Sequence, residues 1–68
     1  MDSAVKYPSV QVQLTGRDGN AFAIIGGVRR ALSRAGVSRK ELDEFTDEAT
    51  SGDYDHVLAT AMRWVDAL

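Results

Sequence analysis

Residues 10–27, VQVQLTGRDGNAFAIIGG, contain both of the patterns on which the fold of this chain depends. Their first part alternates apolar and polar side chains, which predicts a half-buried β-strand over residues 10–15. One face of that strand would carry Val10, Val12 and Leu14, and the other Gln11, Gln13 and Thr15. Pro8 is expected to start the strand and not to lie inside it, which leaves residues 1–7 as a flexible arm.

The second part of the stretch has two interpretations. It could return as the second strand of a hairpin, with Asp18 and Gly19 in the turn. Alternatively, Asn20 could cap a helix that begins at Ala21. At about 100° per residue the apolar side chains of residues 21–35 gather in one arc of about 120°, as an amphipathic helix requires. The pattern therefore favours a helix.

Two more helices are predicted after it. Gly36 is well placed to end the first helix in a left-handed conformation. Ser38 and Glu41 have the spacing of a capping box at the start of the second helix. Asp53 can cap the third, whose apolar positions continue to Leu68 and include Met62, so this helix is expected to be the most buried.

The sequence thus predicts a single α+β domain over residues 1–68, with one N-terminal β-strand followed by three α-helices. A lone strand leaves its backbone N–H and C=O groups unpaired along both edges. The C-terminal RWVDAL is the one other segment with strand character, and it fits the third helix better. We therefore expect the strand to pair with another chain, as an antiparallel homodimer or by strand addition to a partner.

Composition bears on the class of protein. The chain has no cysteine and one histidine, so we expect no disulfide, no metal site and no cofactor. No apolar run approaches the about 18 residues of a membrane span, and the N-terminus lacks a signal-peptide core. We therefore expect a cytoplasmic protein without membrane contact.

Charge is divided along the chain. Residues 1–40 contain seven basic residues and two acids, whereas residues 41–68 contain one basic residue and eight acids. Either the two regions help to align the helices, or the basic side meets an anionic partner. Arg29, Arg30 and Arg34 of the first helix are the candidates for an acidic protein partner.

Two adjacent glycines interrupt the first helix. Each costs about 1 kcal/mol relative to alanine, so the pair needs a reason. Gly26 and Gly27 lie outside the apolar arc, where close packing within the chain or the approach of another molecule would explain them. The predicted interface residues are Val10, Val12, Leu14, Gly26, Gly27, Arg29, Arg30 and Arg34.

The loop GRDGN is a candidate anion site. Free amides at a helix N-terminus attract anions, and the glycines would permit close approach. The residues that would form this site are Gly16, Arg17, Gly19 and Asn20. A turn whose glycines take positive φ explains the loop without a ligand, and Asp18 would oppose an anion.

The order of strand, helix, glycine turn with a capping serine, and second helix resembles in outline the ribbon-helix-helix repressors. The resemblance implies a homodimer that reads DNA through its strand and meets phosphate at the second helix. The residues concerned would be Gln11, Gln13, Thr15, Ser38, Arg39 and Lys40. The chain departs from that family in its longer loop, its acidic second helix and its added third helix.

A second resemblance concerns the amino-acid sequence itself. The strings LTGRDGNAFAIIGGVRRALSRAGVS, ATSGDYDH and MRWV are similar to short uncharacterised proteins of actinobacteria and their phages, which implies a bacterial or phage accessory protein.

Enzymatic activity is not expected. His56 has no cysteine, serine or second histidine expected beside it, so no nucleophile-base pair is recognisable. The leading expectation is a small interaction or regulatory module that self-associates and binds another macromolecule, namely a protein. DNA binding and anion or nucleotide binding are the alternatives.

Overall fold

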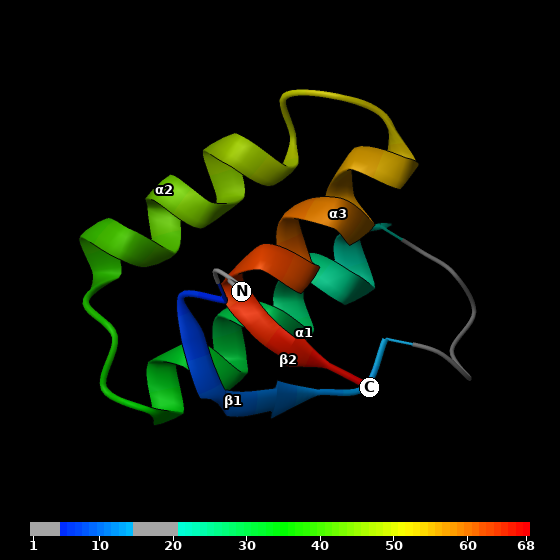
Figure 1. Cartoon of the computed structure of the whole chain (residues 1–68). Helices are drawn as coiled ribbons and strands as arrows, with labels where there is room; N and C mark the ends of the chain where they lie inside the picture. The colour runs from blue at the N-terminus through cyan, green and yellow to red at the C-terminus, as the bar shows by residue number, and fades with distance from the viewer. Residues whose placement is uncertain (1–4, 15–20) are drawn as a thin grey trace.

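The computed structural model describes residues 5–14 and 21–68. The elements are β1 (Tyr7–Val12), α1 (Ala21–Arg34), α2 (Arg39–Ala49), α3 (Tyr54–Trp64) and β2 (Val65–Ala67). The three helices pack on one another, and the two strands lie side by side in the lower part of Figure 1. The α+β class, the N-terminal strand and the three predicted helices are confirmed.

Helix α1 begins at the predicted residue and buries the predicted face. It buries Ile24, Ile25, Val28 and Leu32, all members of the predicted apolar arc. Gly36 follows with a φ of 94°, the left-handed conformation that ends a helix without steric cost only at glycine. The predicted cap Asn20 and the loop before it lie outside the described residues.

Helix α2 has only half of its predicted capping box. The Ser38 side chain accepts a hydrogen bond from the Glu41 N–H at 3.3 Å. The Glu41 carboxylate was expected to accept a hydrogen bond from the Ser38 backbone N–H. It instead accepts one from the hydroxyl of Tyr7. This bond, more than burial and the negative charges of Glu41 and Glu44, raises the pKa of Tyr7. A side chain of β1 thus takes the place of the local backbone partner.

The C-terminal segment overturns two predictions. The third helix does not run to Leu68, because α3 ends at Trp64 and Val65–Ala67 form β2, which pairs with β1 in parallel. The expectation that the N-terminal strand has no partner within its own chain is therefore wrong. The segment RWVDAL, taken from its apolar spacing as helical, supplies the partner.

Hydrogen bonds explain why pairing prevails over helical periodicity. The Lys6 N–H donates to the Arg63 carbonyl at 2.9 Å, and the Leu68 N–H donates to the Val12 carbonyl at 2.8 Å. The Leu14 N–H donates to the Leu68 carbonyl at 3.1 Å. The last carbonyls of a helix have no partner inside it, and neither do the edges of a lone strand. Their pairing satisfies both.

Strand β1 starts earlier than predicted and is irregular. Tyr7 is opposite Val65 whereas Gln11 is opposite Asp66, so the intervening residues of β1 form a bulge. Pro8 lies in this bulge, where its missing N–H removes no ladder bond. From Val10 onward the predicted alternation holds: Val10 is buried, and Gln11 and Gln13 are exposed.

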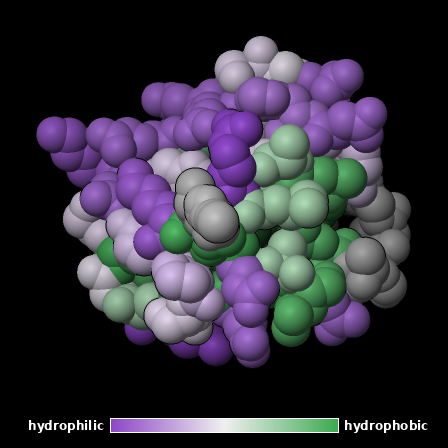
Figure 2. Space-filling view, viewed as in Figure 1, coloured by the Kyte–Doolittle hydropathy of each residue, from purple (hydrophilic) through white to green (hydrophobic). Residues whose placement is uncertain are grey.

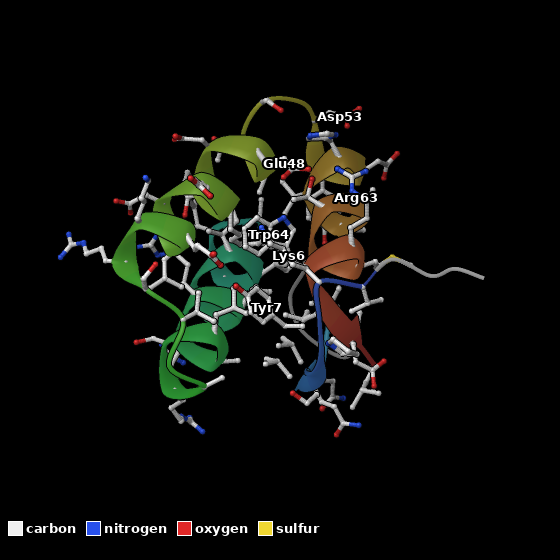
Figure 3. The ribbon with its side chains drawn as sticks, turned by 60° about the vertical axis from the view of Figure 1, so that its left-hand side comes forward. Lys6, Tyr7, Glu48, Asp53, Arg63 and Trp64 are labelled. Carbon is white, nitrogen blue, oxygen red and sulfur yellow. The ribbon has the colours of Figure 1, made fainter. Side chains whose placement is uncertain are left out.

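The indole of Trp64 joins both ends of the chain to the core (Figure 3). Trp64 is only 5% exposed. Its ring stacks on Tyr7 with centroids 6.1 Å apart and meets the edge of Phe45 at 5.4 Å. The Lys6 ammonium lies 4.1 Å from the ring centroid, a cation–π distance. Lys6 and Tyr7, expected to end a flexible arm, are therefore packed against Trp64.

Glu48 connects α2 to two side chains of α3. Its carboxylate accepts hydrogen bonds from the Arg63 guanidinium and, at 3.2 Å, from the Trp64 indole N–H. These two bonds, the Arg63 bond above all, lower the pKa of Glu48.

The molecular surface divides by element. In the view of Figure 2, hydrophilic residues cover α2 and hydrophobic residues gather over α3 and the end of β2. Met62 of α3 and Leu68 at the chain end are 56% and 57% exposed. The prediction that Met62 belongs to the buried arc is wrong, because α3 packs with its Val57 and Ala61 side inward.

Candidate functional site

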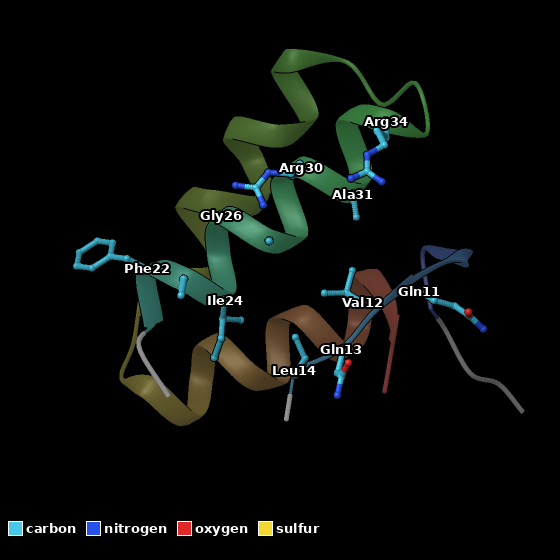
Figure 4. Close-up of a pocket in the computed structure, with 12 residues that line it drawn as sticks. Gln11, Val12, Gln13, Leu14, Phe22, Ile24, Gly26, Arg30, Ala31 and Arg34 are labelled. Carbon is cyan, nitrogen blue, oxygen red and sulfur yellow. The ribbon is translucent and has the colours of Figure 1, made fainter. Parts of the chain in front are cut away.

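A groove of about 800 Å³ runs between α1 and one edge of β1 (Figure 4). The strand side is formed by residues 11–14, and the helix side by the face of α1 that carries Gly26, Arg30 and Arg34. Figure 4 shows Val12 and Leu14 directed from β1 toward α1. Helix and strand lie alongside each other and run in opposite directions, so the groove is elongated.

The edge of β1 that faces the groove is the one not paired with β2. Val12 and Leu14 hydrogen-bond to Leu68 through their backbone groups, so these groups point to the β2 side. Backbone groups of successive strand residues point to alternate edges. The N–H and C=O groups of Gln11 and Gln13 therefore point to the open edge. The described segment that pairs with β1, residues 65–68, lies at the other edge.

The glycine pair lies on the opposite wall of the groove. A Cβ atom built on Gly26 or on Gly27 would meet no described atom within 4 Å. Close packing within the described chain therefore does not explain either glycine. Of the two reasons weighed from the sequence, the approach of something from outside is the one that the geometry leaves open.

The three candidate arginines of α1 have different surroundings. The Arg29 guanidinium crosses to α2, where one nitrogen lies 2.9 Å from the Leu42 carbonyl and 2.6 Å from the Thr46 hydroxyl. The same nitrogen lies 3.3 Å from the Asp43 carboxylate. Arg29 is thus engaged within the molecule.

Arg30 and Arg34 line the groove and make no ion pair or hydrogen bond through their side chains with other described residues. Among the described residues that line the groove there is no acid. The groove thus brings together six residues of the predicted interface: Val12, Leu14, Gly26, Gly27, Arg30 and Arg34. The other two do not line it, because the Val10 side chain is buried in the core and Arg29 binds α2.

The residues proposed to read DNA fall into two groups. Gln11 and Gln13 are exposed on β1, and Thr15 lies outside the described residues. The Gln11 amide lies 3.4 Å from the Asp66 carboxylate, which places a negative charge beside the strand. The second group, Ser38, Arg39 and Lys40, is exposed at the start of α2 and does not line the groove. The parallel pairing within one chain also differs from the intermolecular ribbon of the repressors.

A serine does lie beside His56, contrary to the expectation from the sequence. The Ser51 hydroxyl is 3.0 Å from the His56 Nε2 atom, which is also 2.9 Å from the Glu48 carbonyl. A carbonyl oxygen only accepts, so this ring nitrogen carries the proton and is not placed to take one from Ser51. Ser51 and His56 together cap the last turn of α2.

The remaining candidate is the glycine loop with Gly16, Arg17, Gly19 and Asn20, which lies outside the described residues. Among residues 5–14 and 21–68, no cluster of His, Asp and Glu side chains is arranged to hold a metal ion. The helices described are too short or too polar to cross a membrane. Searches with protein-family models, curated proteins and solved structures found no match to this chain.

Sequence reasoning missed the groove itself. Ile24 and Ala31 were assigned to the core stripe of α1, yet they also line the groove behind the glycines and arginines. The sequence indicates the glycine pair, the three arginines of α1 and the strand edge through three separate patterns. Only the antiparallel placement of α1 over β1 joins them.

Proposed function

We propose that this protein is a non-enzymatic binding module that takes up an extended segment of another protein along the open edge of β1. The supporting observation is the groove, because the edge of β1 that β2 does not pair with lies along one wall of it. Strand addition of this kind uses main-chain hydrogen bonds for affinity and side-chain contacts for specificity. The glycines of the opposite wall leave room for the added backbone.

Self-association was expected because the strand had no partner of its own. Since β2 supplies one, a second copy is no longer needed to satisfy that edge. The other edge is open to any extended segment, and we favour one from a different protein. The cytoplasmic setting and the bacterial or phage origin expected from the sequence belong to the same proposal.

Amide hydrogen exchange tests the proposal without a known partner. The probe is the neutral peptide acetyl-TVNVNVT-amide, titrated into isotopically labelled protein. In the free protein the amides of Val12 and Leu14 are expected to be protected and those of Gln11 and Gln13 to exchange faster, because the first pair points to β2 and the second to the open edge. The peptide should protect Gln11 and Gln13.

The substitution Gln13→Pro removes one of the two N–H groups that point to the open edge and serves as the binding-deficient variant. An added peptide that protects no amide of the open edge, at any concentration that stays soluble, would contradict strand addition. Protection that arises with protein concentration alone would identify a second copy as the natural occupant, which sedimentation across concentrations would confirm.

A further inference from the structure

We infer that the segment bound in this groove is acidic, with two carboxylates separated by one residue that pair with Arg30 and Arg34. The inference rests on the proposed function and specifies its partner. Both arginines line the groove, and no described acid lines it with them. A bound carboxylate would therefore find a guanidinium that has no partner among the described side chains.

The spacing of the two arginines agrees with an extended ligand. Arg30 and Arg34 are four residues apart on α1, which corresponds to about 6 Å along the helix axis. Alternate residues of a strand are separated by about 6.6–6.8 Å and point to the same face. Because α1 and β1 lie alongside each other in Figure 4, a strand added to β1 also runs beside α1. Acids at alternate positions would thus face the two guanidinium groups in turn.

A second copy fits this groove less well than a different protein. When two copies of β1 pair antiparallel about a two-fold axis, the axis stands perpendicular to the sheet and both α1 helices lie on the same face. Arg30 and Arg34 of each copy would then face those of the other, and like charges in such contacts are unfavourable. Charge therefore opposes the symmetric dimer.

The acidic α2 of another copy is not a substitute. Asp43, Glu44 and Asp47 could supply negative charge, but the backbone of a helix hydrogen-bonds to itself. It offers nothing to the free N–H and C=O groups of Gln11 and Gln13. Both the charge of α1 and the open edge of β1 are satisfied by an extended acidic segment.

Three peptides separate the parts of the argument. Acetyl-TVDVDVT-amide carries the acids on one face, acetyl-TVDDVVT-amide has the same composition with the acids on opposite faces, and acetyl-TVNVNVT-amide is neutral. Their affinities are measured by titration at low and at physiological salt. We expect the first to bind about tenfold more tightly than either of the others, equal to about 1.4 kcal/mol. The advantage should shrink as salt rises.

Paired variants locate the charge effect. Arg30→Gln with Arg34→Gln should abolish the advantage of TVDVDVT and leave the binding of TVNVNVT unchanged. The matched control is Arg39→Gln with Lys40→Gln, which removes the same charge from an exposed site outside the groove and should preserve the advantage.

The outcomes distinguish the two proposals. If all three peptides bind equally, strand addition stands and the acidic preference is wrong. If none binds, the proposed function itself fails. If the control variant loses the advantage as well, the preference comes from general attraction and not from the groove. Tighter binding of duplex DNA than of any peptide, lost with Arg30 and Arg34, would overturn the inference in favour of nucleic acid.

Discussion

The two edges of β1 differ in their surroundings, although the same few residues form both. On one edge, Val12 and Leu14 bond to the end of the chain, and the strand entrance is fixed by Tyr7 against Trp64. On the other edge, Gln11 and Gln13 direct their backbone groups into a groove. One edge completes the fold, and the other is the edge to which we propose that a partner adds.

The difference shows that exposure of a side chain and freedom of a backbone are separate properties. In the sequence, Gln11 and Gln13 look like any other polar residues on the solvent-facing side of a strand. Their importance comes from the side of the strand on which β2 lies, because that side decides which backbone groups remain unpaired. Had β2 joined the other edge, Val12 and Leu14 would have been the free positions.

The largest contrast is expected from proline placed at neighbouring positions of β1. Val12→Pro removes an N–H that points to β2 and should lower the free energy of unfolding by about 2–3 kcal/mol. Gln13→Pro removes one that points to the groove and should cost less than about 1 kcal/mol. Urea denaturation followed by circular dichroism measures both. Equal losses at the two positions would remove the distinction between the edges.

A smaller contrast is expected between adjacent arginines of α1. Arg29→Gln breaks the charge-assisted bonds to α2 and should destabilise the protein by about 1–2 kcal/mol. Arg30→Gln, on the groove side, should change stability by no more than about 0.5 kcal/mol. Thermal unfolding of the two variants under identical salt conditions gives the comparison. A destabilised Arg30 variant would mean that the groove arginine also serves the fold.

Substitution of a groove glycine should raise the stability of the protein, unlike the substitutions above. Gly26→Ala adds a methyl group where no described atom lies within 4 Å, so it should stabilise the protein by about 0.5–1 kcal/mol through helix propensity. The same methyl narrows the groove and should weaken binding of the strand peptide. Gly52→Ala is the control, because its Cβ would lie 2.9 Å from the His56 Cβ and should destabilise. Lower stability of the Gly26 variant would point to close packing that the geometry does not contain.

The smallest effect concerns pH on the closed side of the molecule. Hydrogen bonds from Arg63 and Trp64 hold the pKa of Glu48 below its ordinary value of 4.5. A carboxyl with a lowered pKa in the folded state stabilises above its unfolded pKa, and that contribution is lost as the pH falls through the folded value. Glu48→Gln should therefore be less stable than the parent at neutral pH, and the difference should shrink below about pH 4.5. Glu44→Gln, an exposed change on the same helix, should show no such trend in acid titrations followed by tryptophan fluorescence.

Much of the fold could be predicted from local patterns. The arc of Ile24, Val28 and Leu32, the left-handed Gly36 and the serine cap of α2 all depend on neighbours within a few residues. The C-terminal segment could not be predicted in this way. Val65 is apolar at a helical spacing and equally suited to a strand, and only contact with β1 decides between the two.

The candidate site divides along the same line. The sequence indicated the strand alternation, the costly glycine pair and the basic helix, because each is a short-range pattern. It did not indicate that Arg29 turns inward while Arg30 and Arg34 stay on the groove, since that depends on where α2 packs against α1. Nor did it place Ser51 beside His56, which required the turn at Gly52.

The sequence by itself determined that one N-terminal strand and three helices form, because capping, propensity and periodicity act through neighbouring residues. The tertiary structure alone decided how the chain end is used, since the pairing of β2 with β1 joins backbone groups from opposite ends of the chain. That pairing satisfies one edge of β1 and, by the alternation of strand geometry, leaves the backbone groups of Gln11 and Gln13 on the other edge, which lines the same groove as Arg30 and Arg34.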